Sequence, residues 1–165
     1  MAVLLVDAHA NIFHGTSSVL VVPTNASGVM GAGLALKARR AYPSFYRAYV
    51  DEYNLRKLLM GKVFTHRLSV PPPMYVVGLH TMREPGQMAN ADAIRAGLRD
   101  LGRWMMAEGL TTADIPALGC GIGRLDYKLS FLPLIEIIND EFPSLTWNVY
   151  PPHKNTGPRA GGDAA

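Results

Sequence analysis

The sequence has a single cysteine and no segment that marks a membrane or secreted protein. Because Cys120 is the only cysteine in 165 residues, no disulfide can form within the chain, which is typical of a reducing compartment. The apolar run at residues 2–6 is too short to span a bilayer, and it lacks the basic start and cleavage site of a signal peptide. We therefore expect a cytoplasmic protein without membrane contact, and interpret residues 2–7 as a buried first strand.

Two common nucleotide-binding signatures are also missing. The glycine-rich stretch VVPTNASGVMGAGLALKARR at residues 21–40 does not match the G-x-G-x-x-G fingerprint, and no Gly-Lys-Ser/Thr of a Walker A loop follows it. The chain has no internal repeat. Its 16 Lys and Arg against 13 Asp and Glu permit an anionic ligand or nucleic acid. Apart from Lys37, Arg39 and Arg40, however, the basic residues are scattered, which favours an ordinary solvated surface.

The hydrophobic content of 48% is sufficient for one globular domain with a substantial core, which we place at residues 1–150. Residues 151–165 contain too little apolar surface to offset their ordering entropy, so we expect a disordered tail. Strand-like and helix-like stretches alternate, which predicts an α/β sheet with helices on both faces and a ligand crevice beyond the strand ends. The expected strands are residues 2–7, 18–24, 62–70, 74–79, 112–118 and 145–150, and the expected helices are 34–41, 44–60, 90–108 and one ending at 141.

The helices carry recognisable signals. Residues 90–108 form the clearest amphipathic pattern, and Gly109 is a suitable C-cap. Ser44 is a suitable N-cap for the helix of residues 44–60, where Phe45, Tyr49 and Tyr53 share one face and are expected in the core. Asp126 or Ser130 can cap the last helix.

Two glycine loops follow predicted strands, at residues 28–33 and 119–123. A strand that runs through a glycine loop into a helix presents free backbone N–H groups and the positive end of the helix dipole, which suits a phosphate. Two such loops could hold the two phosphates of a diphosphate between them. Taken alone, the first loop could equally be a tight strand-to-helix connection.

The two loops resemble those of the macrodomain family. The likeness rests on Asn25 with GVMGAGLA at residues 28–35, followed far downstream by PALGCGIGRLDY at residues 116–127, and it spans roughly residues 2–150. Within the family, the chain is most similar to the branch of DNA ADP-ribosyl glycohydrolase antitoxins and terminal ADP-ribose protein glycohydrolases. The resemblance implies a three-layer α/β/α fold with a mixed central sheet that binds ADP-ribose or an ADP-ribosylated protein or nucleic acid, with no cofactor and no metal.

The same resemblance implies roles for individual residues. Asn11 and Ile12 take the adenine end, Asn25 meets the distal ribose, and the two loops surround the phosphates, where side chains at the glycines would obstruct the ligand. The implied ligand-binding residues are Asn11, Ile12, Asn25, Gly28, Val29, Met30, Gly31, Gly33, Thr81, Gly119, Cys120, Gly121, Ile122, Gly123 and Tyr127.

The catalytic parts of the family are incomplete. The ester-cleaving branch has a lysine after the strand at residues 74–79, where this chain has Met82, and the always protonated Arg83 beside it is a poor substitute. An acidic residue of some relatives corresponds to Gly123, although the antitoxin branch has glycine there and an aspartate at Asp126. The phosphatase histidine corresponds to Val22, and the aspartate of the MacroD-type hydrolases falls in the stretch Leu34-Ala35-Leu36.

The candidate catalytic residues are therefore Asn25, Asp126 and His80, each weighed against a structural role. Asp126 is either an acid/base or a helix N-cap, and His80 is either a base or a packing residue. Cys120 reads as a small, partly buried side chain and Tyr127 as a wall of the site. Three functions stay open: a hydrolase of ADP-ribosyl linkages or of ADP-ribose 1″-phosphate, a catalytically silent ADP-ribose reader or sponge, and an interaction protein that uses the fold only as a scaffold.

Overall fold

The computed structural model describes residues 2–153 of the chain, so most of the tail expected at residues 151–165 lies outside the described residues. The strands are β1 (Ala2–Leu5), β2 (Val19–Asn25), β3 (Val63–Arg67), β4 (Tyr75–Met82), β5 (Thr112–Pro116) and β6 (Thr146–Tyr150). The helices are η1 (Ile12–His14), α1 (Gly33–Ala41), α2 (Pro43–Asn54), α3 (Ala91–Glu108), the π-helical turn η2 (Tyr127–Phe131) and α4 (Leu132–Glu141).

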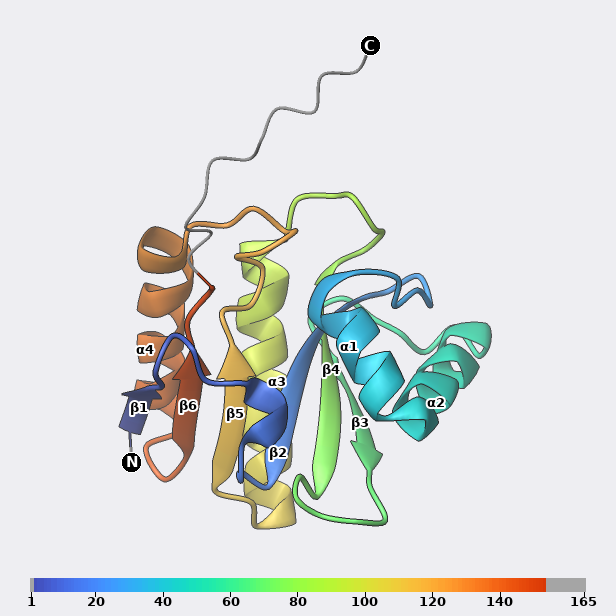
Figure 1. Cartoon of the computed structure of the whole chain (residues 1–165). Helices are drawn as coiled ribbons and strands as arrows, with labels where there is room; N and C mark the ends of the chain where they lie inside the picture. Colours follow the sequence, from blue (N-terminus) through green and yellow to red (C-terminus); the bar gives the residue numbers. More distant parts are fainter. Residues whose placement is uncertain (1, 154–165) are drawn as a thin grey trace.

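The strands form one six-stranded sheet in the order β1-β6-β5-β2-β4-β3. Every neighbouring pair is parallel except β3 and β4, which are antiparallel. Helices α3 and α4 cover one face of the sheet, and α1 and α2 cover the other face over β2, β4 and β3 (Figure 1). The predicted three-layer α/β/α fold with a mixed central sheet is confirmed.

The larger core lies between the sheet and helices α3 and α4. Helix α3 begins and ends where its sequence predicts, since the Asn90 side chain accepts the N–H of Ala93 and Gly109 takes a left-handed φ of 68°. Leu98, Leu101 and Met105 are completely buried on its inner face. The burial of this stripe, more than helix propensity, stabilises the helix.

The smaller core lies beneath α1 and α2. Phe45 and Tyr49 are fully buried there, as their spacing predicts, but Tyr53 is 44% exposed because its ring packs at the edge, against the loop at Gly28. The prediction of Ser44 as N-cap was wrong: α2 begins at Pro43, whose fixed φ suits the first helical position. The helix also ends at Asn54 instead of near residue 60, and Arg56 beyond it has a positive φ of 57°.

Strand β1 differs from its sequence prediction. A run of Val and Leu predicts a buried strand, but β1 lies at the edge of the sheet and pairs only with β6. Leu4 and Leu5 are 50% and 63% exposed. Composition alone does not distinguish an edge strand from a central one, because the position in the sheet is set by long-range pairing.

A buried carboxylate joins the sheet to the segment before β2. Asp114 in β5 is 4% exposed; its carboxylate accepts the Ser17 hydroxyl at 2.8 Å, the Ser17 N–H at 3.3 Å and the Asn148 amide at 3.3 Å. The Tyr150 hydroxyl lies nearby, since both groups crowd the position that a side chain at Gly15 would occupy. These bonds fix the start of β2 and the segment that leads from η1.

Replacing Asp114 with alanine should destabilise the protein by about 2–4 kcal/mol, because two buried donors of Ser17 and the half-buried Asn148 amide lose their charged acceptor. Urea denaturation of the variant measures this change as a lower midpoint. Asp140→Ala, which changes an exposed carboxylate on α4, should stay within about 0.5 kcal/mol of the parent. Equal stability of the two variants would show that the Asp114 cluster contributes nothing.

Candidate functional site at the carboxyl edge of the sheet

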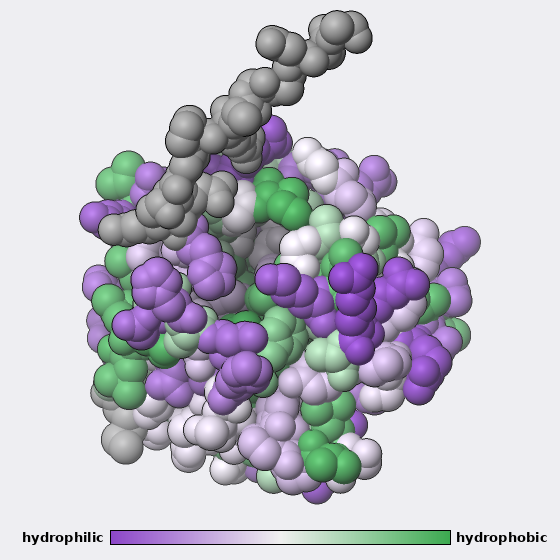
Figure 2. All heavy atoms as spheres, viewed as in Figure 1, coloured by the Kyte–Doolittle hydropathy of each residue, from purple (hydrophilic) through white to green (hydrophobic). Residues whose placement is uncertain are grey.

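Three loops meet at the edge of the sheet where the parallel strands end. Residues 26–32 follow β2, residues 83–90 follow β4, and residues 117–126 follow β5 (Figure 1). The space-filling view from the same side shows a hollow near the centre of this face, with pale and apolar surface flanked by hydrophilic residues (Figure 2). The sequence predicts that both glycine loops follow strand ends, and the structure adds that these strands, β2 and β5, are neighbours in the sheet.

The first glycine loop needs glycine for its backbone shape. Gly28 and Gly33 have φ values of 78° and 56°, where side chains are strained. A Cβ on Gly28 would lie 2.7 Å from the Tyr53 ring, so the loop also packs too closely on α2 for a larger residue. Gly31 has neither constraint and is exposed. The backbone at Gly31 is therefore accessible to a ligand.

Asn25 organises this loop from inside. Its Nδ2 donates to the Val29 carbonyl at 2.7 Å, and its Oδ1 accepts the Ser27 N–H at 3.1 Å and the Ser27 hydroxyl at 3.0 Å. The hydroxyl of the buried Tyr49 lies 2.7 Å from the same oxygen and 2.6 Å from the Asn25 carbonyl. Asn25 is 9% exposed, so its amide shapes the loop and presents little surface to solvent.

Tyr49 positions Asn25 in the candidate site, a role that sequence reasoning missed. Its spacing from Phe45 indicated core packing, which is correct for the ring, but nothing in that spacing signals the bond to Asn25. Burial raises the pKa of the Tyr49 hydroxyl far above its ordinary value, so the group stays protonated and acts as a donor. A strand residue and a helix residue thus position the first glycine loop together.

Backbone N–H groups from both loops are available to a ligand. Within residues 2–153, the N–H groups of Met30, Gly31 and Ala32 have no acceptor, and the same holds for Gly121, Ile122 and Gly123. Helix α1 begins directly after the first set, and no side chain caps its N-terminus. Free donors at the positive end of a helix dipole form a site for an anion.

The second glycine loop combines fixed and open positions. Gly119 has a φ of 77°, and a Cβ there would lie within 3 Å of Leu125, Ala89 and Ile94. Gly123 is equally restricted, because a Cβ would lie 2.7 Å from the Gly119 carbonyl oxygen. Gly121, in contrast, is exposed and faces open space. The close packing at Gly119 and Gly123 therefore fixes the ends of the loop, whereas Gly121 at its centre is open to solvent.

The loops contact one another. The Ile122 side chain reaches Gly33, where an added Cβ would lie 3.2 Å from its terminal methyl group. The Ala89 N–H donates to the Gly123 carbonyl at 2.9 Å, and the Ala26 N–H donates to the carbonyls of Met82 and Arg83. The three loops therefore form one connected rim around the hollow.

Met82, which the sequence resemblance matches to the lysine of the ester-cleaving branch, lies directly beside Asn25 in the structure. The two residues are register partners across β2 and β4, after a bulge between Thr24 and Asn25. A thioether cannot act as a nucleophile toward an anomeric carbon or polarise it as an ammonium group does. Thr81, the preceding residue, is buried, and its hydroxyl lies 3.5 Å from the Thr24 carbonyl.

His80 faces the core beneath α2. It is 2% exposed, its Nδ1 lies 2.8 Å from the Thr24 hydroxyl, and its ring packs 6.4 Å from that of Tyr49. Burial lowers the pKa of the imidazole to about 4, so the ring is neutral and a weak base at neutral pH. This placement favours the structural role of His80 over the role of a base.

Asp126, Cys120 and Tyr127 lie together at the end of the second loop. One oxygen of Asp126 accepts the Leu129 N–H at 2.8 Å, which makes the residue an N-cap, while its exposed second oxygen has no donor within residues 2–153. Burial and the nearby Asp126 charge raise the pKa of the Cys120 thiol to about 11, so Cys120 is not a thiolate. Tyr127 is half-buried and its ring stacks 6.1 Å from Phe131.

Asn11 and Ile12 lie at η1, the short blue helix in front of the sheet in Figure 1. This helix is separated from the glycine loops, which lie at the ends of the strands. The Asn11 side chain caps η1 by accepting the Phe13 N–H at 2.9 Å, and Ile12 is 7% exposed. Asn11 itself is exposed, so its amide N–H groups remain accessible.

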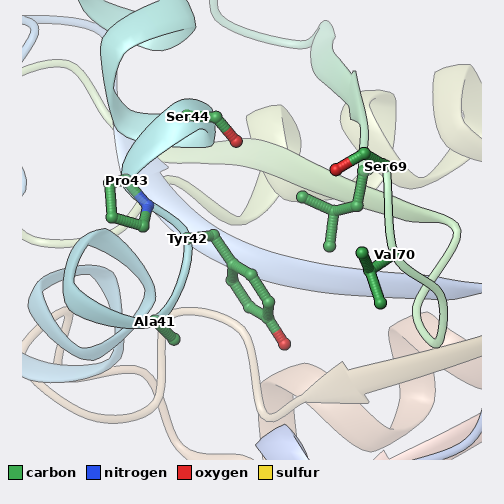
Figure 3. Close-up of a pocket in the computed structure, with 7 residues that line it drawn as sticks. Ala41, Tyr42, Pro43, Ser44, Ser69 and Val70 are labelled. Atoms are coloured by element: carbon green, nitrogen blue, oxygen red, sulfur yellow. The ribbon is translucent and has the colours of Figure 1, made fainter.

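A separate shallow hollow of about 290 Å³ lies away from this edge. It is lined by Ala41, Tyr42, Pro43, Ser44, Leu68, Ser69 and Val70, where α1 meets α2 and β3 ends (Figure 3). Because β3 is antiparallel, its end lies toward the amino edge of the parallel strands. None of the predicted site residues lines this hollow.

Among the described residues, no helix is both long and apolar enough to cross a membrane. Within the same residues, no group of three or more His, Cys, Asp or Glu side chains is placed to hold a metal ion.

The buried imidazole predicts a pH dependence of stability. The unfolded ring titrates near pH 6.5 and the folded ring near 4, so the unfolded chain binds more protons between these values and stability falls as the pH drops through this window. The full loss below pH 4 is about 3 kcal/mol. His80→Asn should flatten this part of a pH series of denaturant midpoints, whereas the exposed His9→Asn should not. An unchanged slope in the His80 variant would contradict the assignment.

Comparison with known proteins places these features in a family. The sequence matches the Macro domain family over residues 21–131. A DNA ADP-ribosyl glycohydrolase of Mycobacterium tuberculosis is 29% identical over 146 residues, which cover 86% of this chain and 40% of that protein. Another, from Thermus aquaticus, is 29% identical over 118 residues, 71% of this chain and 33% of that protein. The chain thus spans well under half the length of these relatives.

Solved structures agree with the sequence match. The macrodomain of Mycobacterium tuberculosis DarG superposes with a TM-score of 0.86 at 25% identity, covering 92% of this chain and 98% of that one. Thermosipho africanus DarTG in complex with ADP-ribose superposes with a TM-score of 0.80 at 25% identity, covering 90% of this chain and 41% of that one. The fold, the two glycine loops and the sequence match together show that this chain belongs to the macrodomain family.

Proposed function

We propose that this chain binds an ADP-ribosyl group between its two glycine loops and hydrolyses the linkage of that group to a macromolecule. The observation that carries the proposal is the convergence of free N–H groups from both loops at the uncapped N-terminus of α1. Two opposed sets of donors match the two phosphates of a diphosphate. The solved relative in complex with ADP-ribose supports the choice of ligand.

The other site residues take roles along the same ligand. Asn11 and Ile12 receive the adenine, and the loops at residues 28–33 and 119–123 hold the diphosphate and the distal ribose. Asn25 acts here through the loop that it shapes, because its side chain is already bonded to Val29, Ser27 and Tyr49. Tyr127 and Cys120 line the distal side.

For hydrolysis, Asp126 is the residue best placed to handle a proton. Its second carboxylate oxygen is exposed and has no donor within residues 2–153, so it can accept a hydrogen bond from a water molecule. The water oxygen bonds to the anomeric carbon as the bond to the leaving group breaks, and the water proton passes to the leaving group. Relatives named DNA ADP-ribosyl glycohydrolases favour a DNA base as that leaving group.

A catalytically silent reader is the second candidate, and Met82 is the observation that favours it. The side chain beside Asn25 cannot perform the chemistry of a lysine, and His80 is buried and weakly basic. Phosphatase action on ADP-ribose 1″-phosphate has less support, since Val22 is fully buried where that branch has its histidine.

Calorimetric titration with ADP-ribose tests binding, and no heat of binding at millimolar ligand would reject both candidates in favour of a scaffold. Incubation with ADP-ribosylated DNA, ADP-ribosylated protein and ADP-ribose 1″-phosphate then separates them. Release that is abolished by Asp126→Ala supports the hydrolase. Tight binding without release from any of the three substrates supports the reader.

Gly121→Val should weaken ADP-ribose binding by at least tenfold while the fold survives, because the new side chain points into open space at the centre of the second loop. Calorimetry measures the affinity and circular dichroism the fold. Gly119→Ala serves as a contrast, since its Cβ has no room and the variant should lose stability. Unchanged affinity in folded Gly121→Val would refute this placement of the diphosphate.

Met82→Lys should raise the rate of release from ADP-ribosylated substrates, because it places an ammonium group beside Asn25 at the position of the family lysine. Single-turnover release of ADP-ribose is the measurement, and Met82→Gln is the control for size and polarity. No gain on any substrate would show that the site differs from the lysine-dependent branch in more than this residue.

A further inference from the structure

The two edges of the sheet differ in how they are protected. At one edge, β3 contacts α2, ends at the exposed Arg67, and has its Val63 N–H bonded to the Asp100 carboxylate at 3.0 Å. At the other edge, β1 pairs only with β6, and residues 2–6 carry no charge and no proline. Charges and prolines commonly protect an edge strand against further pairing. The edge at β1 lacks this protection.

The backbone of β1 presents hydrogen-bonding groups on its outer side. The Val6 N–H donates to the Val149 carbonyl of β6 at 2.9 Å. Because successive residues of a strand direct their N–H and C=O groups alternately to its two sides, Leu4 also faces β6, while Val3 and Leu5 face away from the sheet. Within residues 2–153, no strand lies on that outer side. The backbone groups of Val3 and Leu5 are therefore available to another strand.

The side chains at this edge are apolar and accessible. Leu4 and Leu5 are 50% and 63% exposed, and they lie on opposite faces of the strand. Val3 packs against the core beneath α3 and α4, so Leu5, two residues further on, lies on that same face of the sheet. Figure 2 shows hydrophobic surface along the left margin of the molecule, where Figure 1 places β1. A strand that pairs with β1 removes this apolar surface from water.

We propose that β1 pairs with the β1 strand of a second copy of this chain, antiparallel about a two-fold axis beside Leu4. In this register Val3 of one copy lies opposite Leu5 of the other, and each of these two pairs exchanges two backbone hydrogen bonds. Leu4 lies opposite its own counterpart, apolar against apolar. Residues 2–6 carry no charge that would repel an identical strand or select a different one, so this edge is complementary to itself.

The pairing leaves both candidate sites open. Strand directions reverse across the two-fold axis, so the carboxyl edges, where the glycine loops lie, are at opposite ends of the dimer. The interface is small, because β1 has four residues and is about 13 Å long. A standard interface buries about 800 Å² per partner, and a smaller one gives a reversible dimer that forms at high protein concentration. The dimer needs no ligand, so this inference does not depend on the proposed function.

Sedimentation equilibrium of the full chain tests the proposal. The mass should rise from 17.9 kDa toward twice that value as the concentration approaches about 1 mM. Leu4→Lys places two ammonium groups opposite each other and should raise the dissociation constant at least tenfold. Leu5→Pro should do the same, because it removes an outward N–H and no bond to β6. The matched control is Leu55→Lys, which changes a leucine that is 62% exposed beyond α2 and should leave the association unchanged.

Cysteine cross-linking tests the register. In a glutathione redox buffer, Leu4→Cys should give a disulfide-linked dimer, because directly opposite residues of a pair without hydrogen bonds lie within disulfide reach. Leu55→Cys is the control for random collision and for the native Cys120. Leu5→Cys should cross-link more slowly than Leu4→Cys, since it lies opposite Val3 of the other copy.

Four results would overturn the inference: a monomer at every concentration, association that continues beyond a dimer, equal weakening by Leu4→Lys and Leu55→Lys, or equal cross-linking at residues 4 and 55. Circular dichroism and urea midpoints establish that the variants are folded, and the cross-linking result decides if Leu4→Lys is not. The two proposals fail separately, because a chain that dimerises without binding ADP-ribose rejects only the proposed function, and a monomer that binds ADP-ribose rejects only the dimer.

Discussion

The amide of Asn25 is the interaction on which the ligand-facing edge depends. It joins the end of a central strand to the carbonyl of Val29, the turn at Ser27 and the hydroxyl of the buried Tyr49. These bonds fix the path of a loop whose next N–H groups have no acceptor within residues 2–153. Donors that are held in place before the ligand arrives need little ordering on binding, which favours recognition of an anion.

The same preorganisation explains why ligand binding and catalysis can change independently of each other in this fold. The proposed diphosphate site is made from backbone groups, and such a site needs only glycines and a helix N-terminus. Bond cleavage also needs a suitable side chain at the reacting carbon, and Met82 lies next to Asn25 where the family resemblance implies a lysine. A change at that one residue leaves the glycine loops intact, so a macrodomain can keep its ligand while its catalytic route changes.

Much of the fold was predictable because local signals and tertiary contacts agree. Asn90 and Gly109 mark the ends of α3, and its apolar stripe faces the sheet as its period requires. The structure shows that Gly28, Gly33 and Gly119 have positive φ values, which glycine adopts without strain. The predictions that failed depend on partners distant in sequence: β1 looks like a buried strand but is an edge, and Tyr53 shares the spacing of Phe45 and Tyr49 but reaches only the surface. The ligand-binding and catalytic assignments themselves stay predictions.

The sequence by itself determined the family, the two glycine loops and the substitution of the lysine position by Met82, because these are properties of residue identity and order. Only the tertiary structure decided which side chains are free to act. It buried His80 against Thr24 and Tyr49, committed Asn25 to its own loop, left one oxygen of Asp126 exposed, and placed β1 at the open edge of the sheet. Burial and hydrogen-bond partners arise from contacts between distant segments, and no local pattern of residues specifies them.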